Sequence, residues 1–209
     1  TSVTDYRLEI LNTDCNITDL CDGLRVHREG RLCLYGPPGT GKSAFGRYLA
    51  DALDCPLLIR RASDILSPFV GVTEHKMGKM FREAAEENAV LLLDEADTFL
   101  RDRNGAIRSW EVSEVNEMLT QMESFEGIFI ASTNLMGSLD AAALRRFDMK
   151  VKFDFLNEAQ AWQLFMDSSV KLHLEATEVH KALLANLFLL TPGDFANVLR
   201  QSRLRTINT

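Results

Sequence analysis

The sequence contains no long apolar run and no excess of basic residues, and each absence argues against a class of protein. No stretch reaches the roughly 18 consecutive apolar residues expected of a membrane-spanning helix, and the N-terminus lacks the basic and then apolar layout of a signal peptide. The 209 residues carry a formal net charge of −7, which argues against an open basic surface for nucleic acid, although a local basic stripe could escape this average. We therefore expect no membrane association, and nucleic acid is a disfavoured partner.

The cysteines also lack a pattern that would indicate a metal site. The four cysteines, at positions 15, 21, 33 and 55, show no paired spacing typical of a metal site, so we expect reduced thiols in a cytoplasmic protein. With 46% hydrophobic and 25% charged residues, the chain is long enough for one large core or for a core with a small satellite. It begins at Thr1 and not at Met, so we expect it to be a piece of a longer protein.

The central motif of the chain is a glycine-rich loop between an apolar run at 32–35 and a helix-like segment at 44–53. The loop, with the first residue of that segment, comprises Gly36, Pro37, Pro38, Gly39, Thr40, Gly41, Lys42, Ser43 and Ala44. In this phosphate-binding pattern, consecutive backbone N–H groups and the positive end of the helix dipole surround a polyphosphate. Lys42 would supply a compact positive charge to the outer phosphates, and Ser43 would offer its hydroxyl to Mg²⁺. The flanking strand and helix signals disfavour the alternative, a glycine-rich turn with a surface lysine.

Further apolar runs at 57–59, 89–93 and 128–131 predict buried strands that alternate with helices. The helix after the second strand is expected to have Thr73 as its N-cap and to run through Glu87. Ser109 is expected to cap a later helix, and a weak alternation at 6–11 predicts a short strand near the N-terminus. The alternation of strands and helices predicts a parallel, doubly wound α/β sheet.

Two adjacent carboxylates, Asp94 and Glu95, follow the apolar run at 89–93. Ligands of an open parallel sheet bind at the carboxyl ends of its strands, so both acids are expected beside the phosphates. We expect Asp94 to hold Mg²⁺ directly or through a water, and Glu95 to be the general base for an attacking water. The next strand brings Asn134 to the same edge, where its amide can donate to a γ-phosphate and accept from the water. Solvated strand-end acids and a turn asparagine are the structural alternatives.

Together these motifs resemble an AAA+ ATPase module, closest to the AAA proper branch of protein-remodelling ATPases. The resemblance covers nearly the whole chain in order, through GPPGTGKS at 36–43, LLLDEAD at 91–97, STN at 132–134 and RRFD at 145–148. It implies a P-loop sheet of about five strands flanked by helices, with the phosphate-loop strand central and 151–153 as the last strand, and then a small all-α lid. The expected subdomains are a nucleotide-binding part at 1–155 and the lid at 156–209. The resemblance also implies ATP and Mg²⁺ as cofactors and a ring, expected to be hexameric.

The tail carries three apolar stripes at helical spacing, near 159–166, 179–190 and 195–199, which favour packing into one small satellite core over a partner groove. Thr191, Pro192 and Asp194 have the chemistry of a helix start. By resemblance, Gly193 would lie against the nucleotide, although Pro192 replaces the glycine common there. No arginine stands where other AAA+ branches place a second sensor, and Arg200 is too distant for that role.

The segment at 144–148 is shorter than the family pattern, in which Pro and Gly separate two arginines. By resemblance, an arginine here reaches the neighbouring subunit's site and offers a planar fork of donors to the γ-phosphate. Arg146 fits this position best, and Arg145 is either a second finger or a bridging surface residue. Two solvated arginines are the local alternative.

Phe69, Val70 and Gly71 lie in a loop between the second strand and the next helix, where no strand or helix periodicity explains their apolar side chains. The segment resembles the pore loop of AAA unfoldases, in which an aromatic ring grips a threaded chain. Pro68 stands where a lysine is common. A local hydrophobic plug is the alternative.

Two classes of function therefore compete. One is a ring-forming ATPase that couples ATP hydrolysis to remodelling or threading of a protein substrate. The other is a nucleotide-gated assembly module that pulls no polypeptide, and a nucleic-acid motor is a third, weaker option. The two acids and Asn134 favour hydrolysis, and Phe69 favours threading.

Overall fold

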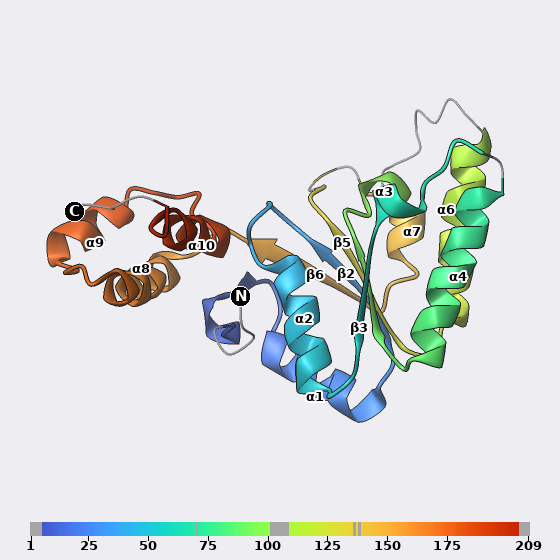
Figure 1. Cartoon of the computed structure of the whole chain (residues 1–209), viewed down its shortest axis with the longest axis horizontal. Coiled ribbons are helices and arrows are strands. Elements are labelled where there is room, and N and C mark those ends of the chain that lie inside the picture. Colours follow the sequence, from blue (N-terminus) through green and yellow to red (C-terminus); the bar gives the residue numbers. More distant parts are fainter. Residues whose placement is uncertain (1–5, 70, 101–108, 136, 138, 205–209) are drawn as a thin grey trace.

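The computed structural model of the chain describes residues 6–69, 71–100, 109–135, 137 and 139–204. Its centre is a six-stranded sheet in the order β1-β6-β2-β5-β4-β3 (Figure 1). Five strands are parallel: β2 (Gly30–Tyr35), β3 (Leu57–Arg61), β4 (Val90–Asp94), β5 (Ile128–Thr133) and β6 (Met149–Asp154). The two-residue β1 (Asn12–Thr13) pairs antiparallel with β6 at one edge. The predicted parallel α/β sheet is thus confirmed, with the phosphate-loop strand β2 in its interior.

Helices cover both faces of this sheet. One face carries α1 (Ile17–His27) and α2 (Lys42–Ala52), and the other carries α4 (Val72–Glu86) and α6 (Ser109–Ser124) (Figure 1). The shorter α3 (Ala62–Ile65), α5 (Asp97–Leu100) and α7 (Ala141–Leu144) join the second layer. Leu91 and Leu93 pack with the second layer and Leu92 with the first, because successive side chains of a strand point to opposite faces. Burial on both faces explains why the strands are continuous apolar runs.

Two local predictions are wrong. Residues 6–11 form no strand; instead they contain a short 3₁₀-helix, η2 (Leu8–Ile10). Thr73 is not an N-cap, because α4 begins after Gly71, whose φ of +81° is in the left-handed region that glycine adopts at no steric cost. Thr73 is instead fully buried, and its hydroxyl accepts a hydrogen bond from the Ser67 N–H at 3.0 Å. Helix α6 begins at Ser109 itself, whose side chain and the residues before it lie outside the described part, so its role as a cap stays a prediction.

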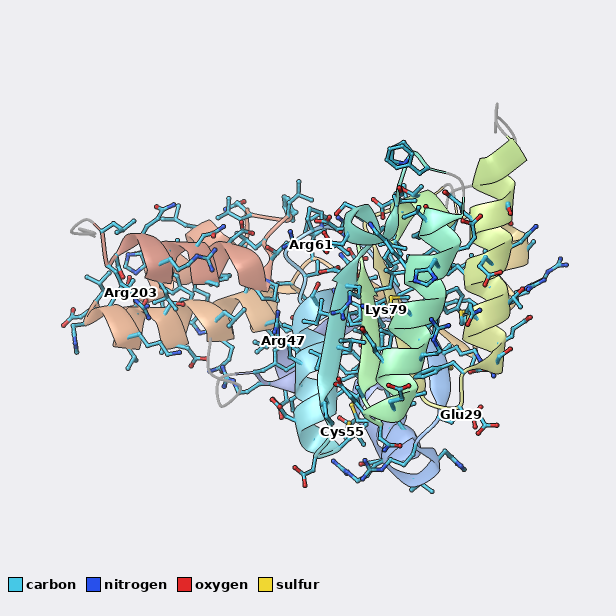
Figure 2. The ribbon with its side chains drawn as sticks, turned by 45° about the vertical axis from the view of Figure 1, so that its right-hand side comes forward. Glu29, Arg47, Cys55, Arg61, Lys79 and Arg203 are labelled. Atoms are coloured by element: carbon cyan, nitrogen blue, oxygen red, sulfur yellow. The ribbon has the colours of Figure 1, made fainter. Side chains whose placement is uncertain are left out.

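Three helices follow β6: α8 (Glu158–Leu172), α9 (Glu178–Leu184) and α10 (Pro192–Gln201). They lie to one side of the sheet and its helices in both Figure 1 and Figure 2. The expected helix start is confirmed, since α10 begins at Pro192 with Thr191 as its N-cap residue; Thr191 and Asp194 form a capping box there, with the Thr191 N–H donating to Asp194 Oδ2 at 2.8 Å. A subdomain boundary at 155/156 stays a prediction.

The expected satellite core of this lid forms only in part. Trp162 and Phe165 of α8 stack at 5.6 Å between ring centroids, and Phe165 lies 5.5 Å from the His180 ring of α9. Val179 and Leu183, which belong to the second stripe, are 68% and 61% exposed. The prediction that the second stripe packs into the lid core is therefore wrong for α9. This two-turn helix has no buried residue, and its apolar stripe faces solvent.

Candidate nucleotide-binding site

The phosphate loop joins β2 to α2, and α2 begins at Lys42 as the motif requires. Three glycines of the loop have positive φ values that other residues rarely adopt: +141° at Gly36, +81° at Gly39 and +103° at Gly41. A Cβ on Gly36 would also lie 1.9 Å from the Phe153 carbonyl oxygen of the neighbouring strand. The glycines therefore allow a left-handed loop that runs close to β6 and points the N-terminus of α2 toward an anion.

Lys42 is almost fully buried at the floor of this loop. Its Nζ donates to the carbonyl oxygens of Gly36 and Pro37 at 2.7 and 2.8 Å and to Asn134 Oδ1 at 2.9 Å. These three contacts use all three donors of the ammonium group. Burial lowers the pKa of Lys42 from 10.5 to about 8, and the Asp94 and Asp97 carboxylates only partly oppose this shift. An incoming phosphate oxygen must therefore replace one of the present acceptors.

Asp94 ends β4 directly opposite this loop. Its Oδ2 accepts a hydrogen bond from the Ser43 hydroxyl at 2.8 Å, and its Oδ1 accepts from the Ser132 hydroxyl on β5. A hydroxyl and a carboxylate that already touch are hard oxygen donors suited to Mg²⁺, which takes one or two protein ligands together with phosphates and waters. The residues present therefore fit a magnesium ion held by Ser43 and Asp94. The role of Ser132 was not predicted, although its place at the end of β5 in the STN motif was a usable signal.

Glu95 directly follows Asp94, and Asn134 contacts Lys42, the neighbour of Ser43. Glu95 has a left-handed backbone with φ +56°, its N–H donates to Asp94 Oδ1 at 3.1 Å, and its side chain is exposed to solvent. Asn134 is held by Asp97, whose Oδ1 accepts from the Asn134 N–H at 3.2 Å and from the Thr133 hydroxyl. Asp97 was also missed by sequence reasoning, although it is the last acid of the LLLDEAD motif. The structure thus brings Lys42, Asn134 and the Asp94–Glu95 pair to one edge of the sheet.

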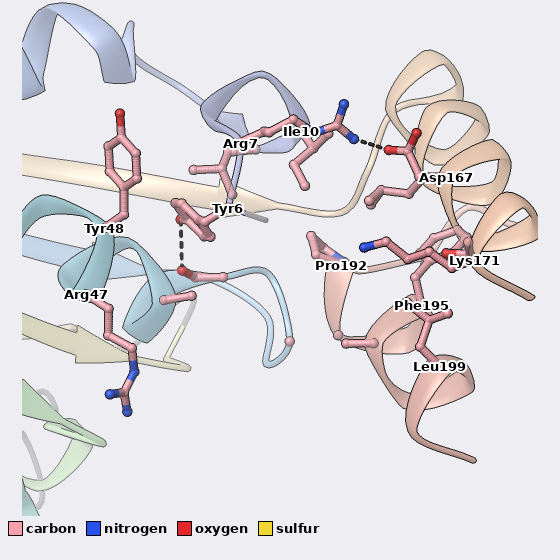
Figure 3. Close-up of a pocket in the computed structure, with 18 of the residues that line it drawn as sticks. Tyr6, Arg7, Ile10, Arg47, Tyr48, Asp167, Lys171, Pro192, Phe195 and Leu199 are labelled. Carbon is pink, nitrogen blue, oxygen red and sulfur yellow. Dashed lines mark hydrogen bonds and ion pairs between the residues drawn. The ribbon is translucent and has the colours of Figure 1, made fainter. Parts of the chain in front are cut away.

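A cavity of about 920 Å³ opens beside the phosphate loop, between the N-terminal segment and the lid (Figure 3). Most of its lining is apolar and includes the side chains of Tyr6, Ile10, Leu11, Leu164, Phe195 and Leu199. Gly193 closes it near the loop: its N–H donates to the Gly39 carbonyl at 2.9 Å, and a Cβ there would lie 3.0 Å from Gly39 Cα. An apolar cavity next to a phosphate loop can hold a nucleobase and its sugar. Sequence reasoning placed Gly193 here but missed the N-terminal wall, which has no motif.

Arg145 and Arg146 lie just after α7, and both are exposed. Arg146 Nη1 is 3.1 Å from Glu123 Oε2 at the end of α6, and Phe147 is buried beside it. Among the described residues, no hydrogen bond joins either arginine to the phosphate loop of its own chain. A role in a neighbouring subunit's site therefore stays a prediction.

Phe69 is 73% exposed at the tip of the loop before α4, so the local hydrophobic plug does not form at this residue. The Phe69 N–H donates to the Ser67 hydroxyl at 3.3 Å, and Gly71 ends the loop with its left-handed turn. Val70 lies outside the described residues.

Residues 32–155 match the model of the ATPase family associated with various cellular activities (AAA). The chain belongs to the AAA family. It is also similar to the ATP-dependent zinc metalloprotease FtsH of Cyanidium caldarium, at 30% identity over 191 residues, and to FtsH 2 of Petrotoga mobilis, at 32% over 188 residues. These matches cover 84% and 83% of this chain but only 30% and 29% of the relatives, so the chain spans less than a third of their length.

Family membership identifies this module as an ATPase, as the sequence motifs predicted. In the part of the chain that the structure describes, no helix combines the length and apolarity needed to cross a membrane.

Proposed function

We propose that this AAA module binds Mg-ATP, assembles into a hexameric ring and couples ATP hydrolysis to threading or remodelling of a protein substrate. The ring and the substrate are supported by the family resemblance and by the exposed Phe69 loop. A cytoplasmic location remains part of this proposal.

The chemistry follows from the residues at the sheet edge. Lys42 would exchange its contact with Asn134 Oδ1 for a phosphate oxygen, which frees the Asn134 amide to orient the attacking water. The exposed Glu95 carboxylate, open to solvent, would take the proton of that water. Bound Mg²⁺ would neutralise charge on the phosphates. The Arg146 guanidinium, released from Glu123, would stabilise the same charge from the neighbouring subunit.

The observation that carries the threading proposal is the exposure of Phe69. Because its side chain is 73% exposed, Phe69 contributes little to the hydrophobic core. An exposed aromatic ring offers contact area to a polypeptide of any sequence. A ring of such loops could grip an extended polypeptide.

The test is Phe69→Ala, with Phe188→Ala as the matched control, since Phe188 in the lid is equally exposed at 76%. In the full-length protein, we expect Phe69→Ala to keep basal ATPase turnover, assembly and melting temperature but to lose substrate-stimulated turnover and unfolding of a tagged reporter. Phe188→Ala should keep substrate-stimulated turnover and unfolding of the reporter. Equal loss in the two variants, or a melting temperature lowered by many degrees in Phe69→Ala alone, would contradict the threading role.

The second candidate, a nucleotide-gated assembly module without threading, is favoured by the extensive apolar surface of the lid, including Val179 and Leu183. It predicts ATP-dependent assembly with no stimulation of turnover by any unfolded protein. A nucleic-acid motor is weaker, because the net charge of −7 opposes binding to phosphate backbones.

A further inference from the structure

Tyr6 lies well before the segment matched by the family, yet it reaches the phosphate loop. Its hydroxyl donates to the Gly41 carbonyl at 3.2 Å across 35 positions of sequence (Figure 3). Its ring packs against Tyr48 of α2, with ring centroids 5.4 Å apart. Burial raises the pKa of the Tyr6 phenol well above its usual value, so the hydroxyl stays a neutral donor.

The Gly41 carbonyl occupies a sensitive place in the loop. It begins α2, because it accepts the first helical hydrogen bond, from the Phe45 N–H at 2.8 Å. The same planar peptide carries the Lys42 N–H on its opposite side. That N–H belongs to the first turn of α2, whose N–H groups have no helical partner and face a bound anion.

A hydrogen bond to this carbonyl therefore also affects the Lys42 N–H, which faces the phosphates. It fixes the peptide plane, and by polarising the amide it makes the Lys42 N–H a better donor. The N-terminal segment also lies close to the loop at Leu11. A Cβ added to Gly41 would lie only 3.1 Å from Leu11 Cδ2. The segment is thus packed against the loop.

We propose that Tyr6 is a positioning residue for the polyphosphate: its hydroxyl holds the Gly41–Lys42 peptide so that the Lys42 N–H faces the phosphates. This role rests on nucleotide binding by the phosphate loop. It makes the N-terminal segment part of the phosphate site, although the Tyr6 hydroxyl itself is bonded to the protein backbone.

The test is Tyr6→Phe, which keeps the ring and removes only the hydroxyl. Calorimetric titrations would use Mg-tripolyphosphate, which lacks base and sugar, and Mg-ATP. We expect both affinities to fall, by at most about fivefold, because the full energy of one neutral hydrogen bond is the upper limit of the effect. KM for ATP should rise by the same factor with kcat unchanged, because the lost contact serves the ground and transition states equally.

Tyr48→Phe is the matched control. Its hydroxyl points away from the loop in Figure 3 and makes no hydrogen bond within the described residues, so both affinities should stay at the wild-type value. Unchanged tripolyphosphate affinity in Tyr6→Phe would overturn the proposal, and so would a loss confined to ATP, which would make Tyr6 only a wall of the base cavity. A lowered melting temperature with unchanged KM would likewise assign a purely structural role. If the wild-type chain binds neither compound, nucleotide binding itself fails, and that outcome is distinct from the others.

Discussion

ATP affinity should weaken above about pH 8, because the free site holds Lys42 with its pKa lowered to about 8 by burial. The negative charge of a bound triphosphate favours the protonated ammonium group and raises the Lys42 pKa. Above about pH 8, binding must therefore take up a proton. The affinity should then fall by about tenfold for each pH unit until the pKa of the bound state is reached.

The same shift sets the sign of the effect on folding. The lysine of the unfolded chain has its ordinary pKa of 10.5, so between about pH 8 and 10.5 the folded, empty protein binds fewer protons than the unfolded chain. Below about pH 8, the buried charge of Lys42 destabilises the empty fold, which lowers the free energy of unfolding. This destabilisation is relieved as pH rises through this window. Nucleotide binding should thus lose strength in the range where the empty fold gains stability from this group.

The assay is calorimetric titration of Mg-ATP from pH 7 to 9.5 in two buffers of different ionisation enthalpy, which reports proton uptake directly. The control is Lys42→Arg, because a guanidinium group does not titrate in this range. Its affinity should be nearly independent of pH, whereas Lys42→Ala should bind ATP weakly at every pH. A wild-type affinity that does not change with pH, or an equal slope in Lys42→Arg, would refute the reasoning. Equal affinities of the wild type and Lys42→Ala at pH 7 would refute the assignment of the loop itself.

Two further predictions concern hydrolysis. Glu95→Gln keeps the shape of the exposed side chain but removes the base, so ATP should still bind while turnover falls by about 10² to 10⁴-fold; unchanged steady-state turnover in the assembled protein would place the base elsewhere. Arg146→Ala and Lys42→Ala proteins, each nearly inactive alone, should partly recover ATPase activity when mixed, because some interfaces then pair an intact site with an intact arginine. The absence of rescue, with a monomer at all concentrations, would contradict a role of Arg146 in the neighbouring site.

The sheet and the phosphate site could be predicted because each depends on contiguous residues. A strand buried on both faces is a continuous apolar run, and a loop that approaches an anion needs glycines at fixed offsets, as the positive φ values of Gly36, Gly39 and Gly41 show. The carboxyl ends of parallel strands share one edge, so Asp94 and Asn134 could be placed together from the sequence alone.

The local errors have a common cause. Thr73 has a good capping side chain, but packing buries it and leaves the start of α4 to Gly71. The apolar stripe of α9 has helical periodicity, yet the described helices leave it in solvent. Periodicity shows that one face of a helix is apolar and does not show what covers that face.

By itself, the sequence determined the fold class, the phosphate loop and the acids at its edge, because these follow from short-range geometry and from the order of strands. Only the tertiary structure decided the remaining walls of the site. Tyr6 meets Gly41 across 35 positions, and Arg7 pairs with Asp167 of α8 across 160. Such contacts are set by how the lid and the N-terminal segment pack against the sheet, and that packing leaves no periodic signal in the residues that make it.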